Sequence, residues 1–413
     1  MPWRERSVMD ERAEFVALAL APGANKAVLC RGFGISRTQG YKWLRRYEAE
    51  GAAGLRDRSR RPRHSPRRTG AMAEAEVLGI RAEQNEAWDG RKIARVLQDR
   101  GCAVVPAPST ISEILRRHGK LADPARRHPG TFQQFERAEP NELWQMDFKG
   151  HFPLARGRWH PLTVLDDHSR YALGLEACGD EQDLTVRGTL TELFRRYGMP
   201  FAMLTDNGAP WGDHGGQAYT AFGVWLMRHG IRVLHGRPYH PQTQGKDERF
   251  HGSLQAEVLN RNSFADLAAC QRAFDRWRQV YNHERPHEAL GLATPGRRYR
   301  PSPRVFPEAL GPIEYAPGDL VRKVCVDGFI SFKGDEWRIG KAFRGEPVAL
   351  RPTGQDGRFS VHYCHQQIAV IDLGERRVDA CGFVGIARAG GEADAGDAHN
   401  STGTTATSCS LNT

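Results

Sequence analysis

The stretch Trp144-Gln-Met-Asp-Phe-Lys-Gly150 decides how the rest of this chain is interpreted. It puts the carboxylate of Asp147 inside an apolar, β-prone run, where burial of an acid is costly unless a cation compensates its charge. A second short apolar run ends at Asp206, which precedes a turn-forming Asn-Gly pair. The stretch His240-Pro-Gln-Thr-Gln-Gly-Lys-Asp-Glu-Arg-Phe250 opens a helical pattern with Glu248 in its first turns. Three carboxylates from two strand ends and one helix predict a hard-oxygen site for Mg²⁺ or Mn²⁺.

The segments around these acids predict an α/β core of the ribonuclease H-like order over residues 141–300. Three strands with short connections form an antiparallel meander, and helices then alternate with strands. In that order the acids of the first and fourth strands lie side by side, and the helix after the fifth strand faces them. The expected strands are 144–150, 159–167, 171–177, 201–204 and 231–234, and the expected helices are 181–197, 218–229, the one bearing Glu248, and 264–281.

This arrangement suits phosphodiester chemistry, which must activate an attacking oxygen and neutralise charge on the phosphoryl group. Two cations roughly 3.5–4 Å apart achieve both. We expect Asp147 to bridge two such ions, with Asp206 and Glu248 holding one ion each. Water, and later a DNA 3′-OH, would be the nucleophile. Asp166 and Asp167 are also paired acids, and we expect them to organise a turn rather than bind metal.

Composition limits the class of protein and its partners. The 413 residues are too many for one core, and the net charge of +10 with a pI near 9.3 favours a polyanionic partner such as nucleic acid. An Arg-rich composition from a GC-rich genome is the alternative. The eight cysteines stand singly, so neither a zinc knuckle nor a disulfide framework is indicated. Without a signal region or a membrane-spanning apolar run, we expect no membrane partner and a cytoplasmic location.

Residues 11–55 predict a helix-turn-helix domain. Two short helices and a Gly-Phe-Gly turn precede a third helix, capped by Ser36, whose outer face is polar and basic. Trp43, Leu44 and Tyr47 are expected to face inward. A trihelical bundle with a merely solvated charged face is the alternative. The predicted DNA contacts of this helix are Arg37, Thr38, Gln39, Tyr41, Lys42, Arg45 and Arg46.

An Arg-rich linker over residues 56–71 follows, and prolines prevent it from forming a helix. Such a strip can lie along DNA phosphates, whereas an ordinary solvated linker need not be so basic. Residues 72–119 then predict a second helix-turn-helix domain, with or without a wing, in which a capping box at Thr110–Glu113 opens the last helix; a plain helical domain is the alternative. The predicted DNA contacts of the linker are Arg56, Arg58, Arg60, Arg61 and Arg63.

The C-terminal quarter changes to short strands punctuated by glycines. About sixty residues of this kind, 317–373, predict a small all-β domain of the SH3-like barrel type. The Ala, Gly, Ser and Thr content of residues 385–413 predicts a disordered tail.

The residues around Asp147, Asp206 and Glu248 resemble the DDE integrase-core superfamily of retroviral integrases and bacterial insertion-sequence transposases. Gln242-Thr-Gln-Gly-Lys-Asp-Glu-Arg249 is the most specific match, and Tyr281-Asn-His-Glu-Arg-Pro-His287 resembles the segment that closes these cores. The two helix-turn-helix units and the Arg-rich linker look like those of single-reading-frame transposases.

The resemblance implies Mg²⁺-dependent cutting at terminal inverted repeats, strand transfer to a double-stranded target DNA, and action as a homo-oligomer on DNA. One departure is Asp247, where an apolar or neutral residue is usual. Adjacent helical residues point about 100° apart, so only one of the two acids reaches the metal. The motif match favours Glu248. Lys246 and Arg249 flank it and are predicted to contact substrate phosphate, unless they belong to a solvated helix face.

Two further hypotheses compete with a transposase. A nuclease of the same fold would cut DNA without joining it. A DNA-binding regulator derived from such an enzyme would use the helix-turn-helix domains without catalysis.

Overall fold

The computed structural model describes residues 7–58, 68–121, 136–154, 157–206, 208, 211, 218–235, 245–382 and 384–385. The chain divides into two compact units, Met1–Thr69 and Gly70–Thr413, and each is described by itself. No helix of the described residues is long and apolar enough to cross a membrane.

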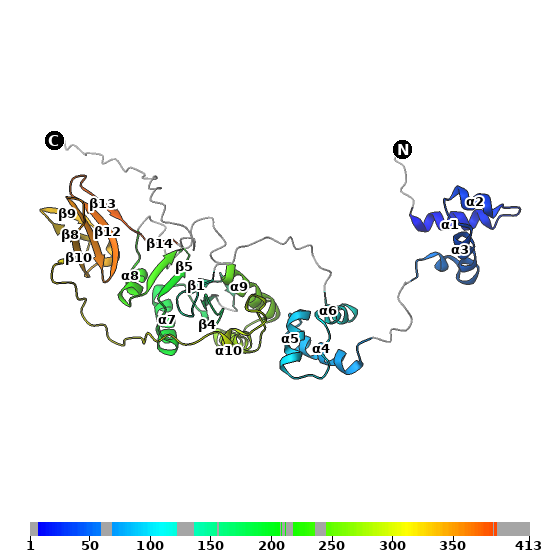
Figure 1. Cartoon of the computed structure of the whole chain (residues 1–413), viewed down its shortest axis with the longest axis horizontal. Coiled ribbons are helices and arrows are strands. Elements are labelled where there is room, and N and C mark those ends of the chain that lie inside the picture. The colour runs from blue at the N-terminus through cyan, green and yellow to red at the C-terminus, as the bar shows by residue number, and fades with distance from the viewer. Residues whose placement is uncertain are drawn as a thin grey trace. The chain divides into compact units, whose positions relative to one another are not determined.

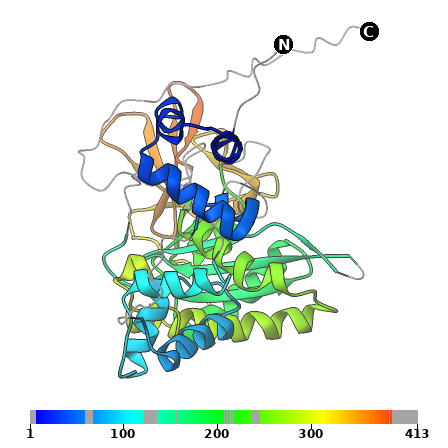
Figure 2. The same cartoon turned by 90° about the vertical axis from the view of Figure 1, so that its right-hand side faces the viewer.

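The first unit is a trihelical domain of α1 (Val8–Ala19), α2 (Lys26–Gly32) and α3 (Arg37–Glu50), followed by the 3₁₀ helix η1 (Gly51–Leu55). Figure 2 shows α1, in the darkest blue, end-on while α3 lies across the view, so the two helices cross steeply. The hydroxyl of Ser36 accepts a hydrogen bond from the Gln39 backbone N–H at 3.2 Å, so Ser36 caps α3 as predicted.

Trp43 and Leu44 are buried, together with Phe15 and Cys30, in the core of this unit. Tyr47 is 37% exposed, so the prediction that it faces inward is wrong. The apolar stripe of α3 ends at Leu44.

The second unit begins with three helices, α4 (Ala71–Glu83), α5 (Gly90–Asp99) and α6 (Pro108–Arg117). Their core includes Ile80, Ile93 and Ile111. The predicted capping box at Thr110 is wrong, because α6 begins at Pro108, whose fixed φ suits the first position of a helix. Residues 68–121 contain no strand, so the structure shows no wing within this segment.

The core sheet has the predicted ribonuclease H-like order. The strand β1 pairs antiparallel with β3, and β3 pairs antiparallel with β4, whereas β1, β5 and β6 run parallel to one another. The strands are β1 (Trp144–Phe148), β2 (Phe152–Pro153), β3 (Arg158–Asp166), β4 (Ala172–Cys178), β5 (Ala202–Thr205) and β6 (Arg232–His235).

Helices cover both faces of this sheet (Figure 1). The helices α7 (Asp183–Tyr197) and α8 (Ala221–Arg228) pack on the face that carries Trp144 and Met146. The helices α9 (Gly245–Glu257) and α10 (Leu267–His283) pack on the opposite face, against Leu165 and Leu175. Short 3₁₀ helices follow at η3 (Leu259–Arg261), η4 (Glu288–Leu290) and η5 (Pro295–Arg297).

The C-terminal domain is all-β, as predicted. Its strands pair antiparallel in a five-stranded sheet of order β13-β12-β11-β10-β7 and a separate β8-β9 hairpin. The sequence did not predict β9, β13 or β14. The short β14 returns to the core and pairs in parallel with β6. The elements are β7 (Leu320–Lys323), β8 (Phe329–Phe332), β9 (Asp335–Arg338), η6 (Lys341–Phe343), β10 (Pro347–Pro352), β11 (Arg358–Tyr363), β12 (Gln366–Asp372), β13 (Arg377–Ala380) and β14 (Val384–Gly385). The predicted tail lies almost wholly outside the described residues.

Candidate active site

Asp147 lies near the end of β1, on the face of the sheet covered by α9. Successive strand residues point to opposite faces, so Trp144 and Met146 enter the apolar core below α7 and α8 while Gln145 and Asp147 face the other way. The Asp147 carbonyl oxygen accepts a hydrogen bond from the Thr163 hydroxyl of β3 at 2.9 Å. The alternation of the strand therefore explains how an acid comes to lie inside an apolar run.

Asp206 follows β5, the parallel neighbour of β1. The register pairs Gln145 with Leu204, so two residues further along each strand Asp147 and Asp206 are at the same level. Burial, and then the negative charge of Asp206, raises the pKa of Asp147 to about 7, with the backbone N–H of Phe148 opposing the shift. The Asp206 carboxylate also accepts the Gly208 backbone N–H at 3.0 Å. The structure thus brings the first two predicted acids together.

The helix α9 presents two adjacent acids differently. Asp247 is 2% exposed, and its Oδ1 has no hydrogen-bond partner among the described residues. Burial raises the pKa of Asp247 well above its usual range, and the charges of Asp147 and Asp167 raise it further. Glu248, the residue predicted from the motif, is exposed on the same turn. In this structure the inward-facing acid of the pair is therefore Asp247, because Phe250 and Leu254 fix the helix phase against α10.

Negative charge is concentrated at this site. The charge of Asp147 interacts with those of Asp206 and Asp247, while Lys149 acts on Asp147 and Arg170 on Asp247 in the opposite sense. The Nδ1 of His251 lies 4.0 Å from Asp147 Oδ2. Burial lowers the pKa of His251 to about 4, so its ring is neutral at pH 7. Oxygen ligands with an unsatisfied charge fit a divalent cation such as Mg²⁺. Among the described residues, however, no group of three His, Cys, Asp or Glu side chains lies close enough together to hold a metal ion.

His251 is a site residue that the sequence analysis missed. Its Nε2 lies 3.0 Å from the Thr163 hydroxyl, which itself donates to the Asp147 backbone. The available signal was its position three residues after Glu248, on the same side of a helix.

Asp166 and Asp167 form a second acidic pair just after β3, and they are bound by many donors. Asp166 accepts the Asn141 backbone N–H at 2.7 Å, and the backbone N–H and hydroxyl of Ser169 at 2.8 and 2.6 Å. These bonds form the turn that the sequence predicted for this pair. Asp167 accepts from the Gln145 side chain at 2.6 Å and forms an ion pair with Lys246.

The predicted DNA-contact residues have different surroundings. In α3 they are exposed except for the half-buried Arg46, and the guanidinium carbon of Arg12 stacks 4.0 Å from the centre of the Trp43 ring beneath them. Arg56, Arg58 and Arg249 are also exposed. The Lys246 side chain is 14% exposed and directed at Asp167. Arg60, Arg61 and Arg63 lie outside the described residues.

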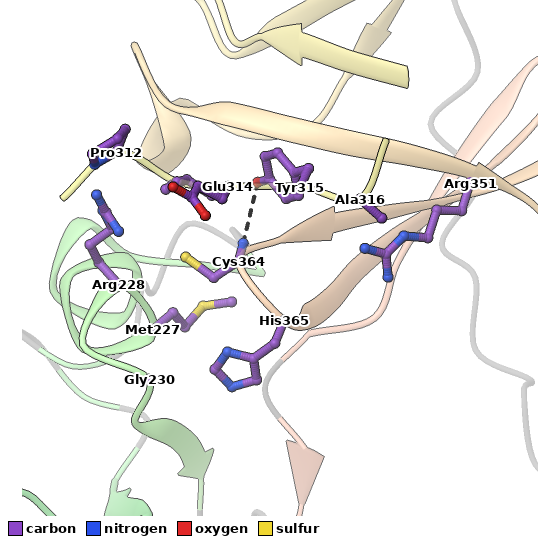
Figure 3. A pocket seen from close by; sticks show the side chains of 11 residues that line it. Met227, Arg228, Gly230, Pro312, Glu314, Tyr315, Ala316, Arg351, Cys364 and His365 are labelled. Carbon is purple, nitrogen blue, oxygen red and sulfur yellow. Dashed lines mark hydrogen bonds between the residues drawn. The ribbon is translucent and has the colours of Figure 1, made fainter. Parts of the chain in front are cut away.

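A separate cavity of about 490 Å³ lies between the core and the C-terminal domain, and none of the three predicted acids lines it. Met227 and Arg228 at the end of α8 form one side of it, and Cys364 and His365 form another (Figure 3). The Tyr315 hydroxyl, on the connecting segment, accepts the Cys364 backbone N–H at 3.3 Å. The cavity thus belongs to the junction between two domains.

Comparison with protein families assigns each part of the chain. An integrase core domain matches residues 137–241 and again residues 229–295. A helix-turn-helix domain matches residues 11–63, and a homeodomain-like domain matches residues 39–115. Residues 137–295 therefore match integrase core domains, and the helix-turn-helix matches lie ahead of them. More particularly, residues 319–379 match the C-terminal domain of the IS481 family of transposases.

Individual relatives agree with this assignment. The chain is 30% identical over 158 residues to an uncharacterised protein of insertion element IS476 from Xanthomonas euvesicatoria, a match that covers 38% of this chain and 44% of the relative. It is 28% identical over 189 residues to an uncharacterised protein of insertion element IS407 from Burkholderia multivorans, covering 45% of this chain and 66% of the relative. The chain thus spans less than two thirds of these relatives.

Among solved structures, the HTLV-2 integrase catalytic core domain in complex with magnesium is 15% identical. The match covers 39% of this chain and 97% of that domain, with a TM-score of 0.29. This superposition is too poor to support a conclusion about the site.

Proposed function

We propose that this chain is a DDE transposase that binds the terminal inverted repeats of an insertion sequence, cuts DNA at the ends and transfers them to a target DNA. The observation that supports this most directly is the pairing of Asp147 with Asp206 on neighbouring parallel strands, under a helix that bears two further acids. The domain assignments support the same class of enzyme.

In this proposal Asp147, Asp206 and Glu248 would hold the divalent ions. Bound Mg²⁺ or Mn²⁺ would supply charge neutralisation at the phosphoryl group and activation of the attacking oxygen. The chain's own residues would orient the DNA end and hold the ligand carboxylates at fixed positions. Asp247 is the alternative ligand on α9, because it is the acid that faces Asp147.

The exposed basic face of α3 and the Arg-rich linker are proposed to bind double-stranded DNA. A polar and basic helix after a tight turn suits the major groove, and arginines of a linker suit phosphates. Assembly as a homo-oligomer on DNA is part of the same proposal, since two element ends must reach one target.

The experiment that tests this function uses the purified full chain, a labelled duplex of the element's terminal repeat and a plasmid target. We expect joined products with Mg²⁺ or Mn²⁺ and none with EDTA. Cleavage without joining under either metal would instead identify a nuclease. Repeat-specific binding without cutting or joining would identify a regulator.

A further inference from the structure

Asp167, the residue just after β3, is a point where three separate parts of the core meet. Its Oδ1 accepts a hydrogen bond from Gln145 Nε2 of β1 at 2.6 Å, and its Oδ2 accepts the Arg137 backbone N–H at 2.8 Å. Lys246 of α9 donates to the same Oδ1 and, at 3.1 Å, to the Asp167 carbonyl oxygen. The Asp167 side chain is fully buried and that of Lys246 is 14% exposed, so solvent and salt screen this ion pair little.

The positions of these partners relate the ion pair to the candidate site. Gln145 comes two residues before Asp147 and shares its face of β1, since side chains alternate along a strand. Lys246 comes two residues before Glu248 in the first turn of α9. Asp167 therefore binds β1 two residues before Asp147 and binds α9 two residues before Glu248.

The remainder of α9 is held by a different kind of contact. Phe250 packs edge-on against Tyr281 of α10, with ring centres 4.8 Å apart. Near the end of α9, Glu257 accepts a hydrogen bond from Trp277 Nε1 at 2.7 Å. These contacts fix the helix from Phe250 onward. The first turn, which carries Asp247 and Glu248, lies ahead of them, where Lys246 joins it to β3.

We propose that Asp167 and Lys246 are positioning residues, whose ion pair fixes the first turn of α9 at the distance and rotation that its acid needs to share a metal site with Asp147. The inference rests on the proposed function, because this rotation matters to catalysis only if an acid of α9 binds metal. It gives Lys246 a role different from the phosphate contact predicted from sequence. If Lys246 positions α9, its effect on the rate of joining requires Asp167. If Lys246 contacts DNA phosphate, its effect is independent of Asp167.

A double-mutant cycle separates these roles in the full chain, with Lys246→Met, Asp167→Asn and the double variant. We expect each single change to lower the rate of strand joining about 10–100-fold, the usual effect of removing a group that orients a metal ligand. The double variant should be no slower than the slower single variant, and both singles should need more Mg²⁺ for half-maximal joining. Lys246→Arg should restore most of the rate. If Lys246 contacts DNA instead, the two losses multiply and Lys246→Met weakens DNA binding, which overturns the inference.

A second measurement follows the helix itself by hydrogen exchange of residues 245–250, without DNA. Both single variants should exchange faster there than the wild type, while α1–α3 stay unchanged. Asp319→Asn is the matched control, because Asp319 is also covered and ion-paired, its oxygens lying 2.8 and 2.7 Å from Arg351 in the C-terminal domain. It should leave both exchange in α9 and joining unchanged.

The outcomes distinguish the two levels of the proposal. A wild-type chain that joins DNA, with variants that join at the same rate, overturns the positioning role and leaves the proposed function intact. A wild-type chain that never joins ends overturns the proposed function and the catalytic part of this inference. Unchanged exchange in the variants overturns the anchoring of α9 whatever the activity.

Discussion

Two acidic clusters lie in the core sheet, and their surroundings are opposite. At the end of β3, all four carboxylate oxygens of Asp166 and Asp167 accept hydrogen bonds, and Lys246 adds a positive charge. Beside β1, the carboxylate of Asp147 faces Asp206, and the Oδ1 of Asp247 has no hydrogen-bond partner among the described residues.

This difference separates structural acids from functional ones. A buried carboxylate with its hydrogen bonds complete stabilises the fold that surrounds it. A cluster of buried carboxylates that repel one another costs stability, and such a cost persists where an added ligand, here a metal ion, removes it. The following substitutions test this distinction between the β3 cluster, Asp166 and Asp167, and the β1 cluster, Asp147, Asp206 and Asp247.

The largest effect is expected from Asp147→Asn and Asp206→Asn. Each should lower joining on the order of a thousandfold, since metal ligation is worth several kcal/mol in the transition state and about 1.4 kcal/mol corresponds to tenfold. Repeat binding by gel shift should survive. Retained joining in Asp206→Asn would remove Asp206 from the site.

The next largest effect is expected from Glu248→Gln, and Asp247→Asn is its comparison. We expect Glu248→Gln to lower joining on the order of a hundredfold, roughly 3 kcal/mol, because Glu248 is exposed in this structure and would hold its ion less closely than Asp147 and Asp206. Asp247→Asn should lower joining less and raise the melting temperature of the metal-free protein, because it removes an acid whose burial is unfavourable. The reverse order of the two joining rates would make Asp247 the ligand.

The sequence predicted the arrangement of the sheet and, through it, the proximity of Asp147 and Asp206. Strand alternation and element order are local patterns, and the register of β1 with β5 follows from them. The partner of Lys246 could not be predicted, because Asp167 lies 79 residues away and any exposed acid or phosphate would suit a lysine equally well.

The rotation of α9 could not be predicted either. It depends on how Phe250 and Leu254 pack on α10, which turns Asp247 inward and leaves Glu248 exposed. Leu184 shows the same effect in α7, since it is an apolar residue of a helix that packs on the sheet and is nevertheless 79% exposed. Helical periodicity shows which residues share a face of a helix, but not which of them the neighbouring elements cover.

Asp147 also gives the β1 cluster a pH dependence, although burial raises the pKa of Asp166 and Asp167 in the β3 cluster too. Its pKa rises from an ordinary 3.8 to about 7, so between these values the folded metal-free protein holds a proton that the unfolded chain has lost. The free energy of unfolding should therefore fall as pH rises from about 4 to 7, by at most roughly 4 kcal/mol. Thermal melts across this range should show the decline, and Mg²⁺ should stabilise the wild type most above pH 7. Asp147→Asn should make the decline shallower without removing it, because burial also raises the pKa of Asp247. If the stabilisation by Mg²⁺ did not change with pH, Asp147 would not be the origin of this pH dependence.

The smallest effect is expected at Asp166, and it should concern stability alone. Asp166→Ala leaves the backbone N–H groups of Asn141 and Ser169 without their acceptor, and an unpaired buried donor costs about 1–3 kcal/mol. Denaturant unfolding should show this loss, while the joining rate per folded molecule stays within about twofold of the wild type, because no donor to Asp166 belongs to β1 or α9. Ser169→Ala, which removes one of the three donors and leaves the acceptor, should cost less. A large loss of joining in stably folded Asp166→Ala would show that the β3 cluster takes part in catalysis, and the contrast between the clusters would then be one of degree.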